Sequence, residues 1–397
     1  MAKVILKKGR EDSLKRFHPW VFSGAIAQIV GEPAEGDVVE VYSQDGKFLA
    51  AGHYQIGSIA VRVLSFENGV INEDYWRSML SKALAVRVAT GLADNDRTNC
   101  YRLVHGEGDN LPGLIIDWYD GVCVMQAHSA GMFRAKKQIA AALVEIYGDK
   151  LKAVYDKSSG TAPFKAGLEL VDGYLYKKDG FNDDEQVVVE NGHKFIVNWT
   201  EGQKTGFFLD QRENRALVER YARGRNVLNL FCYTGGFSIY ALGVGAVHVD
   251  SVDSSAKAMA LVDKNVELGG FDSSRHTSLC VDALDYLREV PDGKYDLMIV
   301  DPPAFAKHRG VLNNAIRAYQ RLNAAAISKV APGGLVFTFS CSQVVSKEAF
   351  ALAVFSAAAQ TGRKVRILDR LNQPADHAVN IYHPEGEYLK GLLLYVE

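Results

Sequence analysis

The sequence predicts an α/β protein of several domains: a small N-terminal β-barrel, a middle α+β domain and a C-terminal doubly wound, Rossmann-like domain. Length is one reason, because 397 residues exceed what one ordinary hydrophobic core holds. A second is the change in pattern along the chain, from short β-rich runs to strands that alternate with helix-length segments. We place the domain limits at 1–70, 71–178 and 179–397.

Hydrophobic periodicity predicts the elements of the first two domains. Strand-like runs, separated by glycines, occupy residues 4–8, 37–43, 48–55 and 59–65. The period then becomes that of a helix over 73–90. In the middle domain we expect a helix over 135–147 and strands at 114–120, 122–128 and 153–159.

The last domain opens with a predicted hairpin. Asn191-Gly192 lies between two alternating runs, which is a strong hairpin signal. Apolar runs separated by helix-length segments then indicate parallel strands in a doubly wound sheet. These runs are 226–231, 246–253, 277–282, 295–303 and 334–340.

Composition and charge exclude several classes of protein. No stretch approaches the roughly 20 apolar residues of a membrane helix, and the charged N-terminus is unlike a signal peptide. We therefore expect a cytoplasmic protein with no membrane partner. Five scattered cysteines without a C-x-x-C pair argue against a disulfide framework and a structural metal. The net charge of −2 gives no global sign of nucleic-acid binding, so an RNA partner would require basic residues that gather locally. The start of the chain is such a place, with Lys3, Lys7, Lys8, Arg10, Lys15 and Arg16, although a solvated terminal face is the alternative interpretation.

A glycine turn and three aspartates follow successive strands of the last domain. Gly235-Gly236 allows a ligand to approach the backbone, but it lacks the full dinucleotide and phosphate-loop motifs. Asp253, 18 residues after Gly235, is placed to accept the ribose hydroxyls of an adenosine, and Asp282 could hold the adenine amine. Helix capping is the alternative role for both. With Asp301 in the Asp-Pro-Pro turn, this order indicates an S-adenosylmethionine (SAM)-dependent methyltransferase.

Cys341 lies just past an apolar strand, between two serines. Carbon five of a pyrimidine becomes nucleophilic only when a thiolate adds to carbon six, which is covalent catalysis by a cysteine. Asp301, at the end of the preceding strand, could hold the cytosine ring nitrogen and amine. A buried structural thiol is the alternative for Cys341. The competing chemistry is methylation of an amine at the Asp-Pro-Pro turn, although Ala304 separates this turn from Phe305.

The chain resembles the family of bacterial ribosomal RNA large-subunit methyltransferase I over nearly its whole length. The matching stretches are HPWVFSGAI, GDVVEVYSQDG, GQKTGFFLDQRENR, NLFCYTGGFS, DPPAF, SCS and HPEGEYLKGLLL. The resemblance implies a PUA-like RNA-binding barrel, a SAM-dependent methyltransferase domain and 5-methylcytosine in 23S rRNA as product. It implies Cys341 as nucleophile and Asp301 as the acid that holds the base. The SAM-binding residues that it implies are Asp210, Gln211, Asn229, Phe231, Thr234, Gly235, Gly236, Asp253, Ser254, Asp282, Ala283 and Asp301.

Other functions stay open at this stage. An rRNA methyltransferase acting on a guanine or adenine nitrogen would need no cysteine adduct. A non-catalytic ribosome assembly factor would not need to keep Cys341, and a small-molecule enzyme would have little use for the barrel. In that barrel, His18 could stack on RNA, whereas we expect Trp20 and Phe22 to fill the core. A homodimer is also left open, and either Asp210 or water could remove the carbon-five proton.

Overall fold

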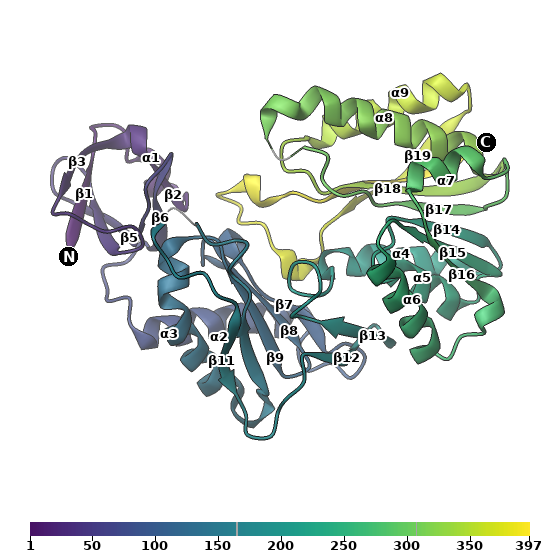
Figure 1. Ribbon diagram of the computed structural model, residues 1–397. Coiled ribbons are helices and arrows are strands. Elements are labelled where there is room, and N and C mark those ends of the chain that lie inside the picture. Colours follow the sequence, from purple (N-terminus) through teal and green to yellow (C-terminus); the bar gives the residue numbers. More distant parts are fainter. Residues whose placement is uncertain (164–165, 307) are drawn as a thin grey trace. The chain divides into compact units, whose positions relative to one another are not determined.

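The computed structural model describes residues 1–163, 166–306 and 308–397. The chain divides into two compact units. The first unit comprises 1–188, 197–209 and 375–386, and the second comprises 189–196, 210–374 and 387–397. Figure 1 shows the elements of both units.

The first unit begins with a curled sheet of six strands, in the order β2-β6-β5-β4-β1-β3 (Figure 1). Its apolar side encloses a small core that includes Val4, Leu14 and Val41. Trp20 and Phe22 do not fill this core, because Trp20 is half-buried and Phe22 is 46% exposed. The buried residue of β2 is Val21. The prediction therefore assigned the wrong face of this strand to the core. The elements are β1 (Ala2–Leu6), α1 (Asp12–Lys15), β2 (Trp20–Phe22), β3 (Ile26–Val30), β4 (Val38–Tyr42), β5 (Phe48–Tyr54) and β6 (Ile59–Ser65).

A second sheet of the first unit has the order β11-β10-β9-β8-β7, and α2 packs against α3. The side chains of Asn72 and Ser129 cap the N-termini of these two helices. Buried Arg87 donates from Nη2 to Asp109 Oδ2 (2.8 Å) and to the Asp376 carbonyl (2.7 Å). The elements are α2 (Glu73–Ala89), β7 (Cys100–His105), β8 (Leu114–Tyr119), β9 (Val122–Ala127), α3 (Ala130–Tyr147), β10 (Ala153–Asp156) and β11 (Gly173–Lys177).

The hairpin predicted at Asn191-Gly192 is present as β12 (Glu185–Glu190) and β13 (His193–Asn198). Both turn residues have positive φ, 51° and 89°, as a tight two-residue hairpin requires. The hairpin contributes residues to both units. In the second unit, Glu190 accepts from Nε and Nη2 of Arg215, each at 2.8 Å, and this buried bidentate pair anchors the strand to α4 (Arg212–Ala222).

The second unit is a seven-stranded sheet in the order β16-β15-β14-β17-β18-β20-β19. The first five of these strands are parallel, and β20 is antiparallel to both β18 and β19. Helices α4, α5 and α6 cover one face, and α7, α8 and α9 cover the other (Figure 1). The strands are β14 (Asn226–Leu230), β15 (His248–Asp253), β16 (His276–Cys280), β17 (Leu297–Val300), β18 (Gly334–Ser340), β19 (Val365–Asn372) and β20 (Lys390–Val396). The helices are α4 (Arg212–Ala222), α5 (Gly236–Val244), α6 (Ala256–Leu268), α7 (Ala283–Glu289), α8 (Leu312–Lys329) and α9 (Lys347–Thr361).

This arrangement confirms the doubly wound sheet, and the five predicted parallel strands all form. The sequence did not predict β19 and β20. The strand order reverses between β14 and β17, and ligands of open α/β sheets bind beside such a switch point, at the carboxyl ends of the strands. Every helix in the described part of the chain is too short or too polar to span a membrane.

Candidate functional site

The loop after β14 contains several residues in the left-handed region and leads directly into α5. Phe231 and Tyr233 have φ of 57° and 46°, and Gly235 follows at 78°. Two bulky residues in this region are unusual, and such strain gathers where a backbone is shaped for a ligand. Thr234 is buried, and its carbonyl accepts from Asn265 Nδ2 (2.9 Å), which fixes the loop against α6.

Asp253 ends β15 and holds the neighbouring loop in place. Its Oδ2 accepts from the Tyr233 N–H and its Oδ1 from the Ser255 N–H, both at 3.0 Å. The carboxylate therefore links the loop after β14 to the start of α6, while the side chain stays partly exposed. A carboxylate so fixed at a strand end is suited to accept the hydroxyls of a ribose.

Asp282 lies after β16 and caps α7. Its Oδ1 accepts from the N–H groups of Leu284 (2.8 Å) and Asp285 (3.1 Å). This is the alternative role that the sequence left open for Asp282, and the exposed side chain retains its second oxygen for a ligand. Ala283 beside it is buried, whereas Ser254 is exposed after β15.

Below the glycine turn lies a buried polar network. Asn229 on β14 donates from Nδ2 to the Ser238 hydroxyl (2.9 Å), which is 2.7 Å from the Ser251 hydroxyl. Asn229 and Ser238 are both fully buried. Asn229 thus supports the turn from within the sheet and does not reach the surface itself.

Asp301 and Cys341 directly follow two adjacent parallel strands, β17 and β18, and both side chains are partly exposed. The Asp301 Oδ2 accepts from Gln211 Nε2 at 3.0 Å. Asp301 and Cys341 both act electrostatically on the Tyr319 hydroxyl of α8, whose pKa burial raises to about 12. The predicted pair of residues is therefore gathered at one edge of the sheet.

Two residues at the entry to α4 complete this edge. Buried Asp210 accepts from the Tyr388 hydroxyl at 2.7 Å. Gln211 is held in turn by Asn214, whose Nδ2 donates to the Gln211 Oε1 at 2.6 Å. The amide of Gln211 is thereby oriented with its nitrogen toward Asp301.

Two polar residues of this site, Tyr388 and Lys390, were not predicted from the sequence. Lys390 is 5% exposed on β20, and its Nζ donates to the carbonyls of Ser342 (2.6 Å) and Val345 (2.7 Å). Both residues lie in the HPEGEYLKGLLL stretch, which matches the family, but the match assigned no function to either of them. Burial lowers the pKa of Lys390 to about 8.

Two family models match the chain. A PUA-like domain matches residues 4–66, and an S-adenosylmethionine-dependent methyltransferase matches residues 172–392. The second match spans more than half of the chain and contains the whole edge described above. The fold and the site thus define a SAM-dependent methyltransferase with an N-terminal PUA-like domain.

Curated relatives show to which family of SAM-dependent methyltransferases the chain belongs. A ribosomal RNA large subunit methyltransferase I from Aeromonas hydrophila is 40% identical, and the match covers 99% of each chain. A protein of the same name from Alteromonas mediterranea is also 40% identical, over 99% of this chain and 98% of the relative. The chain belongs to the ribosomal RNA large subunit methyltransferase I family.

Solved structures of similar fold are described as SAM-dependent methyltransferases. A Streptococcus mutans protein, described as a candidate SAM-dependent methyltransferase, is 25% identical with a TM-score of 0.84. A candidate methyltransferase in complex with SAH has the same identity and a TM-score of 0.85. Each match covers 100% of both chains.

The residues present fit SAM. Gly235 and Gly236 carry no side chain in the loop after β14, which lies at the switch point, and the Asp253 carboxylate lies at the end of the next strand. SAM, when bound, supplies an electrophilic methyl group on a sulfonium. Asp253, Asp282 and the glycines of the loop after β14 are the residues that would hold SAM at this edge.

Proposed function

We propose that the protein methylates carbon five of a cytosine in 23S ribosomal RNA, with SAM as methyl donor and Cys341 as nucleophile. The observation that carries this proposal is the placement of Cys341 and Asp301 at adjacent strand ends. Methylation of an amine at an Asp-Pro-Pro turn requires no cysteine nucleophile, so it would not explain a thiol at this position. The relatives named for ribosomal RNA large subunit methylation supply the substrate class.

In the proposed reaction, the Cys341 thiolate adds to carbon six of the cytosine and forms a sulfur–carbon bond. This addition displaces the electron pair of the carbon five–carbon six double bond, so that carbon five becomes nucleophilic and could take the methyl group from SAM, which would leave as the neutral thioether. A base removes the carbon-five proton, the double bond re-forms and the Cys341 thiolate leaves. This sequence is nucleophilic catalysis through a covalent adduct.

Asp301 would serve the same cytosine from the neighbouring strand. A carboxyl group there can hold the ring nitrogen and the exocyclic amine, and favour protonation of the ring nitrogen as sulfur adds. Gln211 orients Asp301 through its 3.0 Å hydrogen bond. We assign the loop from Phe231 to Gly236, together with Asp253, Ser254, Asp282 and Ala283, to SAM binding. Buried Asn229 of β14 would support this loop from within the sheet.

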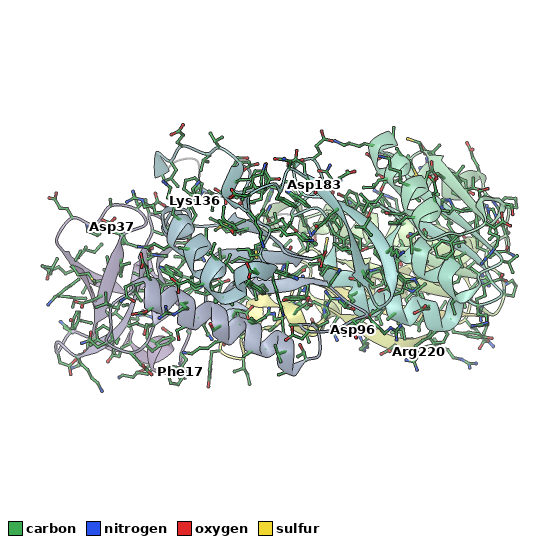
Figure 2. The ribbon with its side chains drawn as sticks, turned by 90° about the horizontal axis from the view of Figure 1, so that it is seen from below. Phe17, Asp37, Asp96, Lys136, Asp183 and Arg220 are labelled. Atoms are coloured by element: carbon green, nitrogen blue, oxygen red, sulfur yellow. The ribbon has the colours of Figure 1, made fainter. Side chains whose placement is uncertain are left out.

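We further propose that RNA bases stack on an aromatic surface of the first unit, formed by Phe17, Phe66 and Tyr382. The Phe17 ring centroid lies 5.3 Å from that of Phe66 and 5.3 Å from that of Tyr382. Phe17 is 48% and Tyr382 49% exposed, and Figure 2 shows Phe17 at the outer edge of its view. Exposed rings beside a basic residue, here the exposed Arg16, are typical of single-stranded RNA contacts.

Adduct trapping tests the proposed chemistry. Transcribed 23S rRNA that contains 5-fluorocytidine should form a stable protein–RNA adduct, because fluorine cannot leave carbon five as a proton does. We expect the native protein and Cys280→Ala, which removes an exposed cysteine, to form the adduct with SAM present. Cys341→Ala should form none and should still bind SAM. Methyl-labelled SAM and ordinary rRNA should place the label in 5-methylcytosine.

Other outcomes separate the alternatives. Label in a methylated guanine or adenine, unchanged in Cys341→Ala, would overturn the cytosine assignment and favour methylation at a nitrogen. Absence of label despite SAM binding and RNA binding would favour the assembly factor. A cytoplasmic location and a homodimer stay predictions.

A further inference from the structure

Lys390 is a buried ammonium placed directly behind the turn that carries Cys341. It starts β20, where it pairs in register with Ser340 of β18, the residue before Cys341. From this position its Nζ donates to the carbonyls of Ser342 and Val345, so two of its donors fix the backbone that follows Cys341. A lysine with 5% exposure is uncommon, because burial of an ammonium is unfavourable unless partners offset it.

Among the groups that act electrostatically on Lys390, Cys341 is the acidic group whose charge is not already paired with a surface lysine. Three groups act electrostatically on Lys390, namely Cys341, Glu387 and Lys347. Glu387 is bound by Lys347 near the surface, where both side chains are more than a third exposed. Glu387 is therefore screened by water and largely neutralised by its own partner.

Asp301 is a second acidic group in the neighbourhood of Cys341. Asp301 shares the neighbourhood of Tyr319 with Cys341, and a carboxylate there disfavours a second negative charge. A thiolate at this edge would thus be opposed by Asp301 and needs a cation nearby. Of the described residues, Lys390 is the buried cation that the structure places against this turn.

We propose that Lys390 is a positioning residue for Cys341, which fixes the turn through two carbonyls and favours the thiolate over the thiol with its positive charge. This inference rests on the proposed role of Cys341 as nucleophile. A nearby lysine or arginine is known to lower thiol pKa values in reactive cysteines, to about 3.5–7.5. The pKa of Lys390, which burial lowers and the Cys341 charge raises, reflects the same coupling from the other partner.

The test measures the Cys341 thiolate directly. Native protein without RNA is alkylated with iodoacetamide between pH 5.5 and 10, and the rate at Cys341 is followed by peptide mass spectrometry. Lys390→Met removes the charge and keeps an apolar chain of similar length, while Lys390→Arg keeps the charge. Exposed Cys280 in the same samples is the internal reference.

In the native protein we expect the alkylation midpoint of Cys341 below the ordinary thiol value of about 8.5. Lys390→Met should move this midpoint up by at least one unit, so that alkylation at pH 7 slows roughly tenfold while Cys280 is unchanged. In Lys390→Arg, which keeps the positive charge, the alkylation midpoint of Cys341 should lie between the native value and that of Lys390→Met. These readouts require no RNA, so they are independent of whether the product is 5-methylcytosine.

Two results would overturn the inference. A rate in Lys390→Met that differs from native by the same factor at every pH would mean that Lys390 controls only access to Cys341. A native midpoint at or above 8.5 would exclude thiolate stabilisation, even if no Lys390 variant folds. If Cys341→Ala keeps full methyltransferase activity while the alkylation shift is observed, the nucleophile proposal fails and the lysine–cysteine coupling stands.

Discussion

The Ser342 hydroxyl donates a hydrogen bond to the Ala306 carbonyl, with 2.6 Å between the two oxygens. Ser342 follows Cys341, and Ala306 lies five residues after Asp301, so this bond joins the two loops of the proposed catalytic pair. Both residues are buried, at 1% and 2% exposure. The bond is therefore shielded from water and helps to hold the two loops together.

Removal of this hydroxyl should affect turnover more than binding. In Ser342→Ala the Ala306 carbonyl loses its donor, and a displacement of about 1 Å between reacting groups can lower turnover roughly 100-fold. We expect turnover on rRNA to fall by roughly 10- to 100-fold, with SAM affinity little changed. Ser129→Ala, which removes an N-cap in the first unit at a comparable stability loss of about 1 kcal/mol, is the matched control. An equal fall in both variants would show a loss of stability only.

The glycine turn offers a pair of matched substitutions. Gly235 and Gly245 both have positive φ, 78° and 96°. A methyl group at Gly235 would lie 3.1 Å from Val262 Cγ1, whereas at Gly245 it would meet no atom within 4 Å. Both alanine variants should lose roughly 1 kcal/mol to backbone strain. Only Gly235→Ala should also weaken SAM binding, by roughly tenfold in calorimetry, because the loop must shift. Equal SAM affinity in the two variants would remove Gly235 from the binding site.

The sequence predicts which residues meet at this edge of the sheet because its signals are local. Gly235, Asp253, Asp301 and Cys341 each follow a recognisable strand, and parallel strands bring their carboxyl ends together. The contribution of Lys390 is not local. It arises because β20 inserts antiparallel beside β18, and no periodicity within a short C-terminal apolar run fixes that pairing. Phe22 shows the same limit, since alternation predicts that a strand has two faces but not which of them is buried.

The aromatic surface should contribute to RNA affinity. Stacking of a base on an aromatic ring contributes about 1–3 kcal/mol, so loss of two rings should raise the Kd for an rRNA fragment at least about tenfold. Phe17→Ala combined with Tyr382→Ala tests this by filter binding at fixed salt. Phe355→Ala removes a ring of 67% exposure from α9 and should leave the Kd unchanged. An unaltered Kd in the double variant would exclude the surface from RNA binding.

Acid should destabilise the first unit through His53. This histidine of β5 is 3% exposed, its ring stacks near Trp76 at 6.2 Å, and among the described residues its Nδ1 has no hydrogen-bond partner. Burial lowers the pKa of His53 from 6.5 to about 4. Between these values the unfolded chain binds the proton and the folded chain does not, so stability falls as the pH drops from 6.5 to 4.

The expected loss is up to about 3 kcal/mol over this window, because each pKa unit corresponds to about 1.4 kcal/mol. His53→Leu removes the titrating group and keeps an apolar side chain. Urea unfolding of this variant, followed by tryptophan fluorescence, should depend less on pH between 6.5 and 4 than unfolding of the native protein. His308→Leu, at an exposed histidine, should retain the native pH dependence. If His53→Leu loses stability with acid as steeply as the native protein, His53 is protonated without unfolding, and the acid sensitivity arises at other buried groups such as His128, whose pKa burial also lowers to about 4.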